Sequence, residues 1–315
     1  MFELIQDDLA AFELRLAEEL KSSVAFIEAI GGNLASAGGK RLRPSLAFLA
    51  GKLLSASSAK AMQVALAVEL LHSASLLHDD LIDDADTRRG SEAAFRRYGN
   101  VVSVMSGDYM LARVLGLLAE AHVADFTRLM SQAAADICEG EVLQFQMATL
   151  ETFSFANYLK VIEGKTAVLF AAALEGVAIL SSASDAQRAA LRDFGMAYGR
   201  AFQMQDDYLD LLGDEASLGK PVGGDLREGK ATYPVLLLLE KDVSEAGRIL
   251  KRHAQQEGDV ARVIKLVKEH GADEETRAAI REQAQAAVQA LGIFPDGPAK
   301  AELLALAERE MARRR

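Results

Sequence analysis

The feature that most constrains this chain is the scarcity of proline alongside long alanine- and leucine-rich stretches. Only five prolines occur among 315 residues, and a proline inside a helix removes a backbone hydrogen bond and clashes with the preceding turn. Val64, Val68 and Leu71 recur at the spacing of one helical face, as in an amphipathic helix. We therefore predict an all-α fold, with helices within residues 60–78, 127–147, 155–180, 185–212 and 231–241.

Glycine, serine and proline clusters divide these stretches, and none of them has the length or composition of a flexible linker. The chain is long for one domain but within the range of a large helical one. We predict a single domain over residues 1–315, with breaks between helices at Gly31–Gly32, Gly38–Gly39, Gly90, Gly99–Asn100, Ser181–Ser184, Gly213–Asp214, Gly219–Gly224 and Pro295–Pro298.

Composition and charge exclude several classes of function. The formal net charge is −11, which disfavours nucleic acid as a partner because a duplex-binding surface needs a basic face. No window reaches the run of about 18 apolar residues that predicts a membrane span, and the acidic first twenty residues do not have the pattern of a signal peptide. Cys138 is the only cysteine. We therefore expect a cytoplasmic protein without a transmembrane segment.

Two acidic motifs of the same form, D-D-x-x-D, each end an apolar helical stretch. The first is Asp79-Asp80-Leu81-Ile82-Asp83 and the second is Asp206-Asp207-Tyr208-Leu209-Asp210. Residues four apart share a helical face, and like charges at that spacing repel one another. Carboxylates placed in this way need a compensating cation. Hard oxygen ligands select Mg²⁺, with Mn²⁺ as an alternative.

A single short motif of this kind is as often a solvated helix end as a metal site, but two copies in similar contexts favour the metal site. Basic residues lie close by: Lys40, Arg41 and Arg43 follow a glycine pair, and Arg88 and Arg89 come five residues after the first motif. Arginine offers a fork that matches phosphate, and lysine a point charge. The combination indicates a small anionic ligand, such as a diphosphate bound through metal ions.

Taken together, the motifs resemble those of the trans-isoprenyl diphosphate synthases, also called the polyprenyl synthetase family. The resemblance runs in the family's order over about residues 38–234, close to two-thirds of the chain. It is carried by the two acidic motifs and by Gly38–Pro44, Arg88-Arg89-Gly90, Gly164-Lys165-Thr166, Phe202-Gln203, Gly219-Lys220-Pro221, Asp225-Leu226 and Gly229-Lys230-x-Thr232. It implies the isoprenoid synthase fold, a single large helical bundle around a central cavity, and a homodimer.

The resemblance also implies the reaction: condensation of isopentenyl diphosphate with an allylic diphosphate after metal-assisted ionisation. The expected Mg²⁺ ligands are Asp79, Asp83 and Asp206, supported by Asp80, Asp207 and Asp210. The expected isopentenyl diphosphate-binding residues are Lys40, Arg43, His72 and Arg89. The expected allylic diphosphate-binding residues are Arg88, Lys165, Thr166, Gln203, Lys220 and Lys230; of these, Lys165, Thr166 and Gln203 are also expected to be catalytic. Glu141 and Gln144 are expected to support this network.

Product length should depend on the residues one and two turns before Asp79. Family members that make short products often place an aromatic side chain there, whereas this chain has Ala74 and Ser75, with Leu71 deeper. Both residues are small, so a growing chain could pass. We expect a long-chain product, such as an octaprenyl diphosphate. An apolar product of this kind is compatible with weak peripheral membrane contact.

Three alternatives differ in which motifs they need. A geranylgeranyl or farnesyl diphosphate synthase would share the chemistry but form a shorter product. A terpene cyclase would lack the isopentenyl-binding set represented by Lys40, Arg43 and Arg89. A non-catalytic regulatory subunit of a two-component synthase would lack the acidic motifs, and both are present here. The sequence therefore favours an active long-chain synthase.

Overall fold

The structure is a computed structural model that describes residues 2–36, 39–84, 86–88, 91–215 and 221–312. The chain forms two compact units. Unit 1 comprises residues 1–134, 169–192 and 293–303, and unit 2 comprises residues 135–168, 193–292 and 304–315. Helices α7 (Ala124–Leu150), α10 (Asp185–Leu212) and α17 (Pro298–Ala312) each contribute several residues to both units, and α9 (Val168–Leu180) and η3 (Leu291–Ile293) each have one residue in the other unit.

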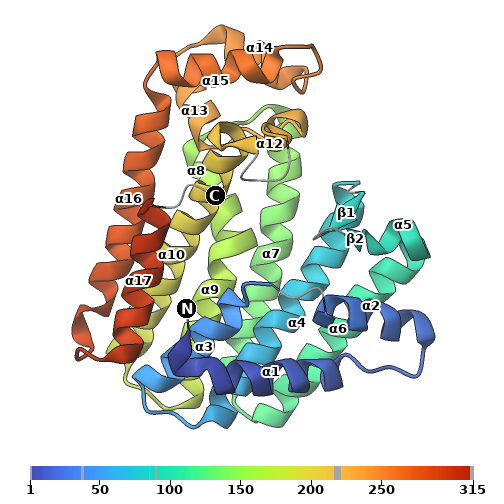
Figure 1. The fold of residues 1–315 in the computed structure, drawn as a ribbon, viewed down its shortest axis with the longest axis vertical. Helices are drawn as coiled ribbons and strands as arrows, with labels where there is room; N and C mark the ends of the chain where they lie inside the picture. Colours follow the sequence, from blue (N-terminus) through green and yellow to red (C-terminus); the bar gives the residue numbers. More distant parts are fainter. Residues whose placement is uncertain (1, 37–38, 85, 89–90, 216–220, 313–315) are drawn as a thin grey trace. The chain divides into compact units, whose positions relative to one another are not determined.

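Unit 1 contains the N-terminal helices and one short β-ribbon (Figure 1). Its elements are η1 (Glu3–Ile5), α1 (Gln6–Glu19), α2 (Ala25–Ser36), α3 (Leu42–Leu53), α4 (Ser58–Ile82), β1 (Thr87–Arg88), β2 (Ser91–Glu92), α5 (Ala94–Tyr98), α6 (Asn100–Ala121), the start of α7 (Ala124–Leu150), most of α9 (Val168–Leu180) and the starts of α10 (Asp185–Leu212) and α17 (Pro298–Ala312). The two strands are antiparallel, with Thr87 opposite Glu92.

Helix α4 is the centre of unit 1 and packs most extensively against α6 and α3. Close approach depends on small residues. A Cβ atom on Gly176 of α9 would lie 3.0 Å from both Phe126 of α7 and Val64 of α4, so these three helices touch where glycine leaves room. Phe48, Phe126 and Phe170 are among the largest fully buried side chains. Burying such rings removes a large apolar area from water, which is the main stabilising contribution to a helical core.

Unit 2 contains the remaining helices. They are α8 (Phe155–Ile162), the π-helical segment η2 (Glu163–Ala167), α12 (Gly224–Arg227), α13 (Tyr233–Glu240), α14 (Ser244–Lys251), α15 (Asp259–Glu269), α16 (Ala272–Ala290) and η3 (Leu291–Ile293), together with the remaining parts of α7, α10 and α17. One apolar core joins the end of α10 to α13, α14 and α15, with Met204, Leu209, Leu236 and Leu250 buried in it. Figure 1 shows α14 and α15 lying across the end of α16.

The predicted helices correspond closely to the observed ones. The prediction for residues 185–212 matches α10, and those for 60–78 and 127–147 fall within α4 and α7. The predicted break at Gly31–Gly32 is wrong, because both residues lie inside α2. A Cβ atom on Gly31 would lie 2.9 Å from the carbonyl oxygen of Leu20, so this glycine allows close packing rather than ending the helix. The stretch 155–180 is α8 and α9 with η2 between them.

Within the described part of the chain, one helix, α6, is long and apolar enough to cross a membrane by length and composition alone. One of its faces is buried, at Ser103, Ser106, Gly107 and Met110, and the helix packs against α4. A core helix of a soluble protein can pass the same test. The expectation that the chain has no transmembrane segment therefore stays a prediction.

Candidate functional site

The first acidic motif lies at the C-terminal end of α4, in unit 1. The backbone N–H of Asp83 donates to the carbonyl oxygen of Asp79 at 2.8 Å, so the helical turn continues through the motif. Asp80 is buried, Asp79 is half-buried and Asp83 is exposed. The carboxylates of Asp79 and Asp83 are therefore the two that solvent, and a ligand, can reach, as residues four apart on one face should be.

Helix α6 fixes the position of this end of α4. A Cβ atom on Gly107 would lie 2.3 Å from Nε2 of His78, the residue before Asp79. The same Nε2 lies 3.3 Å from the carbonyl oxygen of Val104, and the hydroxyl of Ser103 donates to the carbonyl oxygen of Leu77 at 3.3 Å. A side chain at Gly107 would have to displace the His78 ring, and the two hydrogen bonds join α4 to α6 at this level.

The basic segment before α3 divides into two kinds of residue. Arg41 caps α3 with φ +43° and is buried. Its guanidinium donates to Glu13 and Glu69 at 2.7 Å each, so it is an internal ion-pair residue. Lys40 is exposed, and the half-buried Arg43 places its guanidinium 4.7 Å from the centre of the Phe170 ring. Lys40 and Arg43, but not Arg41, are the residues of this segment that the family resemblance assigns to isopentenyl diphosphate.

The residues assigned to product length have different environments. Leu71 and Ala74 are buried, with 4% and 1% of their surface exposed. Ser75 is half-buried, and its hydroxyl donates to the carbonyl oxygen of His72 at 2.9 Å. His72 is itself half-buried. Of the three length residues, Ser75 is therefore the one with surface left to meet a ligand.

The second acidic motif lies in α10, in unit 2, and three segments far apart in the sequence meet around it. The hydroxyl of Thr166 donates to Oε1 of Gln203 at 2.8 Å, and Nε2 of Gln203 donates to Oδ1 of Asp207 at 2.8 Å. The other carboxylate oxygen of Asp207 accepts a hydrogen bond from the hydroxyl of Tyr158 at 2.7 Å. The predicted residues Thr166, Gln203 and Asp207 are thus brought into one hydrogen-bonded run.

Residues 223–230 supply the third segment. The backbone N–H of Asp225 donates to Oδ2 of Asp210 at 3.0 Å, and that of Gly223 donates to the carbonyl oxygen of Asp210 at 2.6 Å. Gly223 has φ +79°, a conformation that favours glycine. The side chain of Lys230, at the end of the segment, lies 2.5 Å from Glu228. The glycine-rich segment therefore carries Asp225 and Lys230 to the acidic motif.

The carboxylates of this region raise one another's pKa. The pKa of Asp207 is raised to about 6: burial is the largest cause, the charges of Asp206 and Asp210 add to it, and hydrogen bonds from Tyr158 and Gln203 oppose it. Burial, followed by the charges of Asp207 and Asp210, raises the pKa of Asp225 well above its usual range, and Lys230 opposes this shift. The pKa of the Tyr158 hydroxyl is also raised, by burial and by the charge of Asp207. The region thus holds more negative charge than its lysine offsets, which suits a cation.

Lys165 lies in η2, where the backbone departs from the α-helical pattern. Its ammonium donates to Oε1 of Gln144 at 2.7 Å and forms an ion pair with Glu141, both on α7. A Cβ atom on Gly164 would lie 2.5 Å from the backbone oxygen of Asp136, so only glycine lets η2 approach α7 this closely. Such π-helical turns often occur at functional sites, and this one presents Lys165 and Thr166 side by side in the chain.

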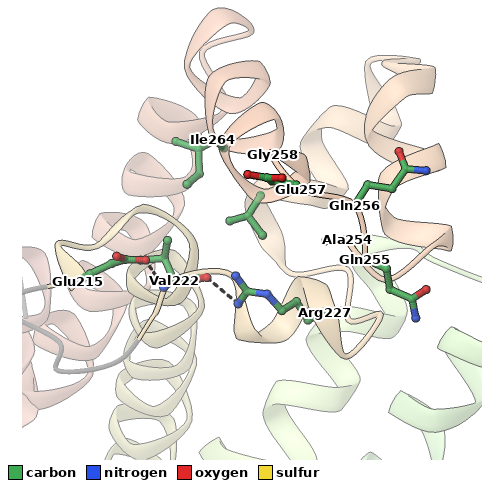
Figure 2. A pocket seen from close by; sticks show the side chains of 11 residues that line it. Glu215, Val222, Arg227, Ala254, Gln255, Gln256, Glu257, Gly258 and Ile264 are labelled. Atoms are coloured by element: carbon green, nitrogen blue, oxygen red, sulfur yellow. Dashed lines mark hydrogen bonds between the residues drawn. The ribbon is translucent and has the colours of Figure 1, made fainter.

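A cavity of about 560 Å³ in unit 2 is lined by residues from the segments 222–227 and 254–264 (Figure 2). Glu215 accepts a hydrogen bond from the backbone N–H of Val222 at 3.0 Å, and Arg227 donates to the Val222 carbonyl at 2.9 Å. The cavity is lined by Glu215, Val222, Arg227, Ala254, Gln255, Gln256, Glu257, Gly258, Val260, Ala261 and Ile264. None of these is a predicted site residue.

Some predicted residues cannot be placed. Arg89 and Lys220 lie outside the described residues, and of Arg88 only the backbone, in β1, is described. Among the described residues, no three Asp, Glu, His or Cys side chains are gathered as a ready-made metal site. This arrangement is compatible with Mg²⁺, which usually binds one or two carboxylates and completes its shell with water and phosphate oxygens.

Sequence reasoning missed Tyr158, which contributes directly to the hydrogen-bonded run. Its hydroxyl lies among polar side chains although its ring belongs to the apolar core of unit 2. No local pattern indicated it, because its partner Asp207 lies 49 positions along the chain.

Comparisons with known proteins agree with these motifs. The polyprenyl synthetase family matches residues 24–269. The chain is 35% identical to the octaprenyl diphosphate synthase of Haemophilus influenzae, over 96% of this chain and 93% of that protein. It is 36% identical to the octaprenyl diphosphate synthase of Escherichia coli, over 97% of this chain and 95% of that protein.

A similar solved structure is a polyprenyl synthase from Caulobacter crescentus, crystallised with calcium and isoprenyl diphosphate. It superimposes with a TM-score of 0.92 and 38% identity, covering 99% of this chain and 96% of that one. Solved structures of this kind have the same all-α fold.

Proposed function

Because the chain belongs to the polyprenyl synthetase family, we propose that its two acidic motifs hold the divalent cations on which its prenyl transfer depends. The protein is a prenyltransferase, a trans-polyprenyl diphosphate synthase with the isoprenoid synthase fold. It condenses isopentenyl diphosphate head-to-tail with an allylic diphosphate and makes a long-chain product, as its octaprenyl relatives do.

The observation that carries the assignment of residues is the run from Thr166 through Gln203 to Asp207. It brings together motifs that the sequence separates by 37 residues. We assign Asp79, Asp83 and Asp206 as the principal cation ligands, with Asp80, Asp207 and Asp210 in supporting roles. We propose Mg²⁺ as the cation, because all the proposed metal ligands are carboxylates and Mg²⁺ prefers hard oxygen ligands.

Cations held by these carboxylates would neutralise the negative charge of the diphosphate leaving group. Lys165 and Lys230 contribute positive charge toward that leaving group, and Lys40, Arg43 and His72 bind isopentenyl diphosphate. The Thr166 hydroxyl proton is committed to Gln203, so Thr166 offers lone pairs to another partner. An oxygen dipole of this kind stabilises an allylic cation without supplying a proton. Arg88, Arg89 and Lys220 retain the roles that the family resemblance gives them.

The assignment is tested with purified protein, labelled isopentenyl diphosphate and farnesyl diphosphate, with Mg²⁺ present or removed by chelation. We expect long-chain products only with Mg²⁺, and a loss of turnover of about a thousandfold in Asp79→Asn and Asp206→Asn, as for loss of a major electrostatic contact. The exposed Asp84→Asn is the matched control, since this neighbour belongs to neither motif. Full activity of Asp79→Asn would contradict the assignment of this motif.

Product length is proposed to depend on Ser75, with the more buried Ala74 and Leu71 forming the wall behind it. Ser75→Phe should shorten the product because an aromatic ring takes up space that a growing chain needs. Ala74→Phe should instead unfold or destabilise the protein, since enlarging a fully packed side chain costs about 1–3 kcal/mol or more. Chromatography of the dephosphorylated products reads out the length, and an unchanged distribution in Ser75→Phe would place the limit elsewhere.

We further propose a homodimer in the cytoplasm. Helix α6 exposes Val101, Met105 and Leu115 along one face, and in unit 2 α7 exposes Val142 and Phe145. Large apolar side chains gathered on a helix face are typical of an interface. The free, exposed Cys138 suits a reducing compartment.

A single domain over residues 1–315 is proposed because α7, α10 and α17 belong to both units. Weak peripheral membrane contact and the lack of a nucleic-acid partner stay predictions.

A further inference from the structure

The carboxylate of Asp207 has a donor on each oxygen. Tyr158 donates to Oδ2 at 2.7 Å, and Gln203 donates to Oδ1 at 2.8 Å. Asp207 is 6% exposed, so water has little room to replace either donor. A buried carboxylate oxygen that loses its donor keeps the full cost of its desolvation. The hydroxyl of Tyr158 is therefore one of two groups on which the orientation of this side chain depends.

The same bond has consequences further along the run. A carboxylate only accepts hydrogen bonds, so the neighbouring Gln203 must present its NH₂ to Asp207 and its oxygen to Thr166. The observed Thr166-to-Gln203 bond, at 2.8 Å, has this direction. If Asp207 turned away, the amide of Gln203 would lose the contact that decides which way it faces. The hydroxyl of Thr166 would then be free to rotate.

Tyr158 is itself held rigidly. It lies in α8 and is 4% exposed. Its ring meets that of Tyr233 edge-on, with the ring centres 5.8 Å apart and an angle of 68° between the planes. Tyr233 is the first residue of α13 and follows the segment that carries Asp225 and Lys230. The hydroxyl is thus fixed by a ring that is packed independently of Asp207.

We propose that Tyr158 is a positioning residue for prenyl transfer, which acts by fixing Asp207 and, through it, Gln203 and Thr166. The proposal rests on the proposed function, because it gives those three residues their role in binding and ionising the allylic diphosphate. Tyr158 itself contacts neither a cation nor a substrate in this mechanism. Its effect should therefore appear in the allylic half of the reaction and pass entirely through Asp207.

The test is Tyr158→Phe, which removes the hydroxyl and leaves the ring. We expect kcat to fall about tenfold or more, because hydrogen bonds to charged groups are among the stronger ones. The KM for the allylic diphosphate should rise, with the KM for isopentenyl diphosphate unchanged. In calorimetry with Mg²⁺ and inorganic diphosphate, without substrate, affinity should fall by a similar factor. Tyr109→Phe is the matched control, since its hydroxyl donates to the Lys21 carbonyl at 2.6 Å in unit 1.

A double-mutant comparison separates positioning from general stability. In an Asp207→Ala background, Tyr158→Phe should cause no further loss of kcat, because its route of action is already gone. Independent losses that multiply would overturn the proposal, as would unchanged kinetics in Tyr158→Phe. Absence of turnover in the wild-type protein would instead refute the proposed function. Equal rises in both KM values with a lowered melting temperature would assign Tyr158 a purely structural role and overturn the proposal.

Discussion

At the scale of single residues, Arg41 is a cation whose charge is neutralised by carboxylates within the protein. Its guanidinium donates to Glu13 and Glu69, and the side chains of Arg41 and Glu69 are only 8% and 5% exposed. Burial of the guanidinium tends to lower its pKa, but the two carboxylates outweigh this and leave the pKa raised. Lys40, one residue earlier, is exposed. Neighbouring cations in one basic segment therefore have unrelated tasks.

We predict that Arg41→Met lowers the free energy of unfolding by about 3 kcal/mol, because it leaves the buried Glu69 without its cation. Lys40→Met should leave stability within about 0.5 kcal/mol of wild type, as surface substitutions do, but raise the KM for isopentenyl diphosphate. Urea denaturation and steady-state kinetics on the two variants separate these outcomes. Equal stability of both variants would contradict the ion-pair role of Arg41.

Sequence alone could not separate Arg41 from Lys40, because both belong to the same run of cations and the partners Glu13 and Glu69 are each 28 positions away. The aspartates were easier to find, since their spacing within one helix is readable from the sequence. Tyr158 was missed for the same reason as Glu69: its partner, Asp207, lies 49 positions along the chain. Contacts of that separation depend on how helices pack, which no local pattern encodes.

At the scale of elements, η2 is the feature that composition predicted least well. The stretch 155–180 has the composition of one uninterrupted helix, yet η2 separates α8 from α9. Gly164 stands where a side chain would meet the backbone of α7, with 2.5 Å between a Cβ atom and the Asp136 oxygen. A backbone atom cannot move aside as a flexible side chain can. Lys165, which contacts Glu141 and Gln144, lies within this π-helical turn.

Gly164→Ala should therefore lower both stability and kcat, in spite of alanine's higher helix propensity. We expect about 1–3 kcal/mol of destabilisation from overpacking. Gly32→Ala in α2 is the control, since nothing lies within 4 Å of its Cβ position; there the substitution should stabilise by up to about 1 kcal/mol. Thermal denaturation and turnover are measured on both. A stabilised and fully active Gly164→Ala would show that η2 tolerates a side chain.

At the scale of the whole molecule, the exposed apolar residues predict self-association. Val101 is 76% exposed on α6, and Leu14 is 74% exposed on α1. Val101 shares its helix face with Met105 and Leu115, and this grouping favours α6 as the interface. The all-α class could be predicted from the sequence because helical periodicity continues along nearly the whole chain. The division into two units could not be predicted, since no linker marks it and several helices contribute to both units.

We expect Val101→Glu to shift the protein from dimer to monomer, because a charge buried in an apolar interface loses its hydration without gaining a partner. Leu14→Glu, at nearly the same exposure, should leave the dimer intact. Light scattering coupled to size-exclusion chromatography gives the mass directly. A monomeric wild-type protein, or a dimer that survives Val101→Glu, would rule out this face of α6 as the interface.

Gly107 bears on how such a chain can change over time. One face of α6 touches His78, immediately before Asp79, where a methyl group on Gly107 would displace the His78 ring, and the opposite face carries the apolar side chains proposed to meet a second copy. A substitution on α6 can therefore affect either the position of the first acidic motif or the proposed dimer interface. Sequence change should therefore be slow along both faces of α6.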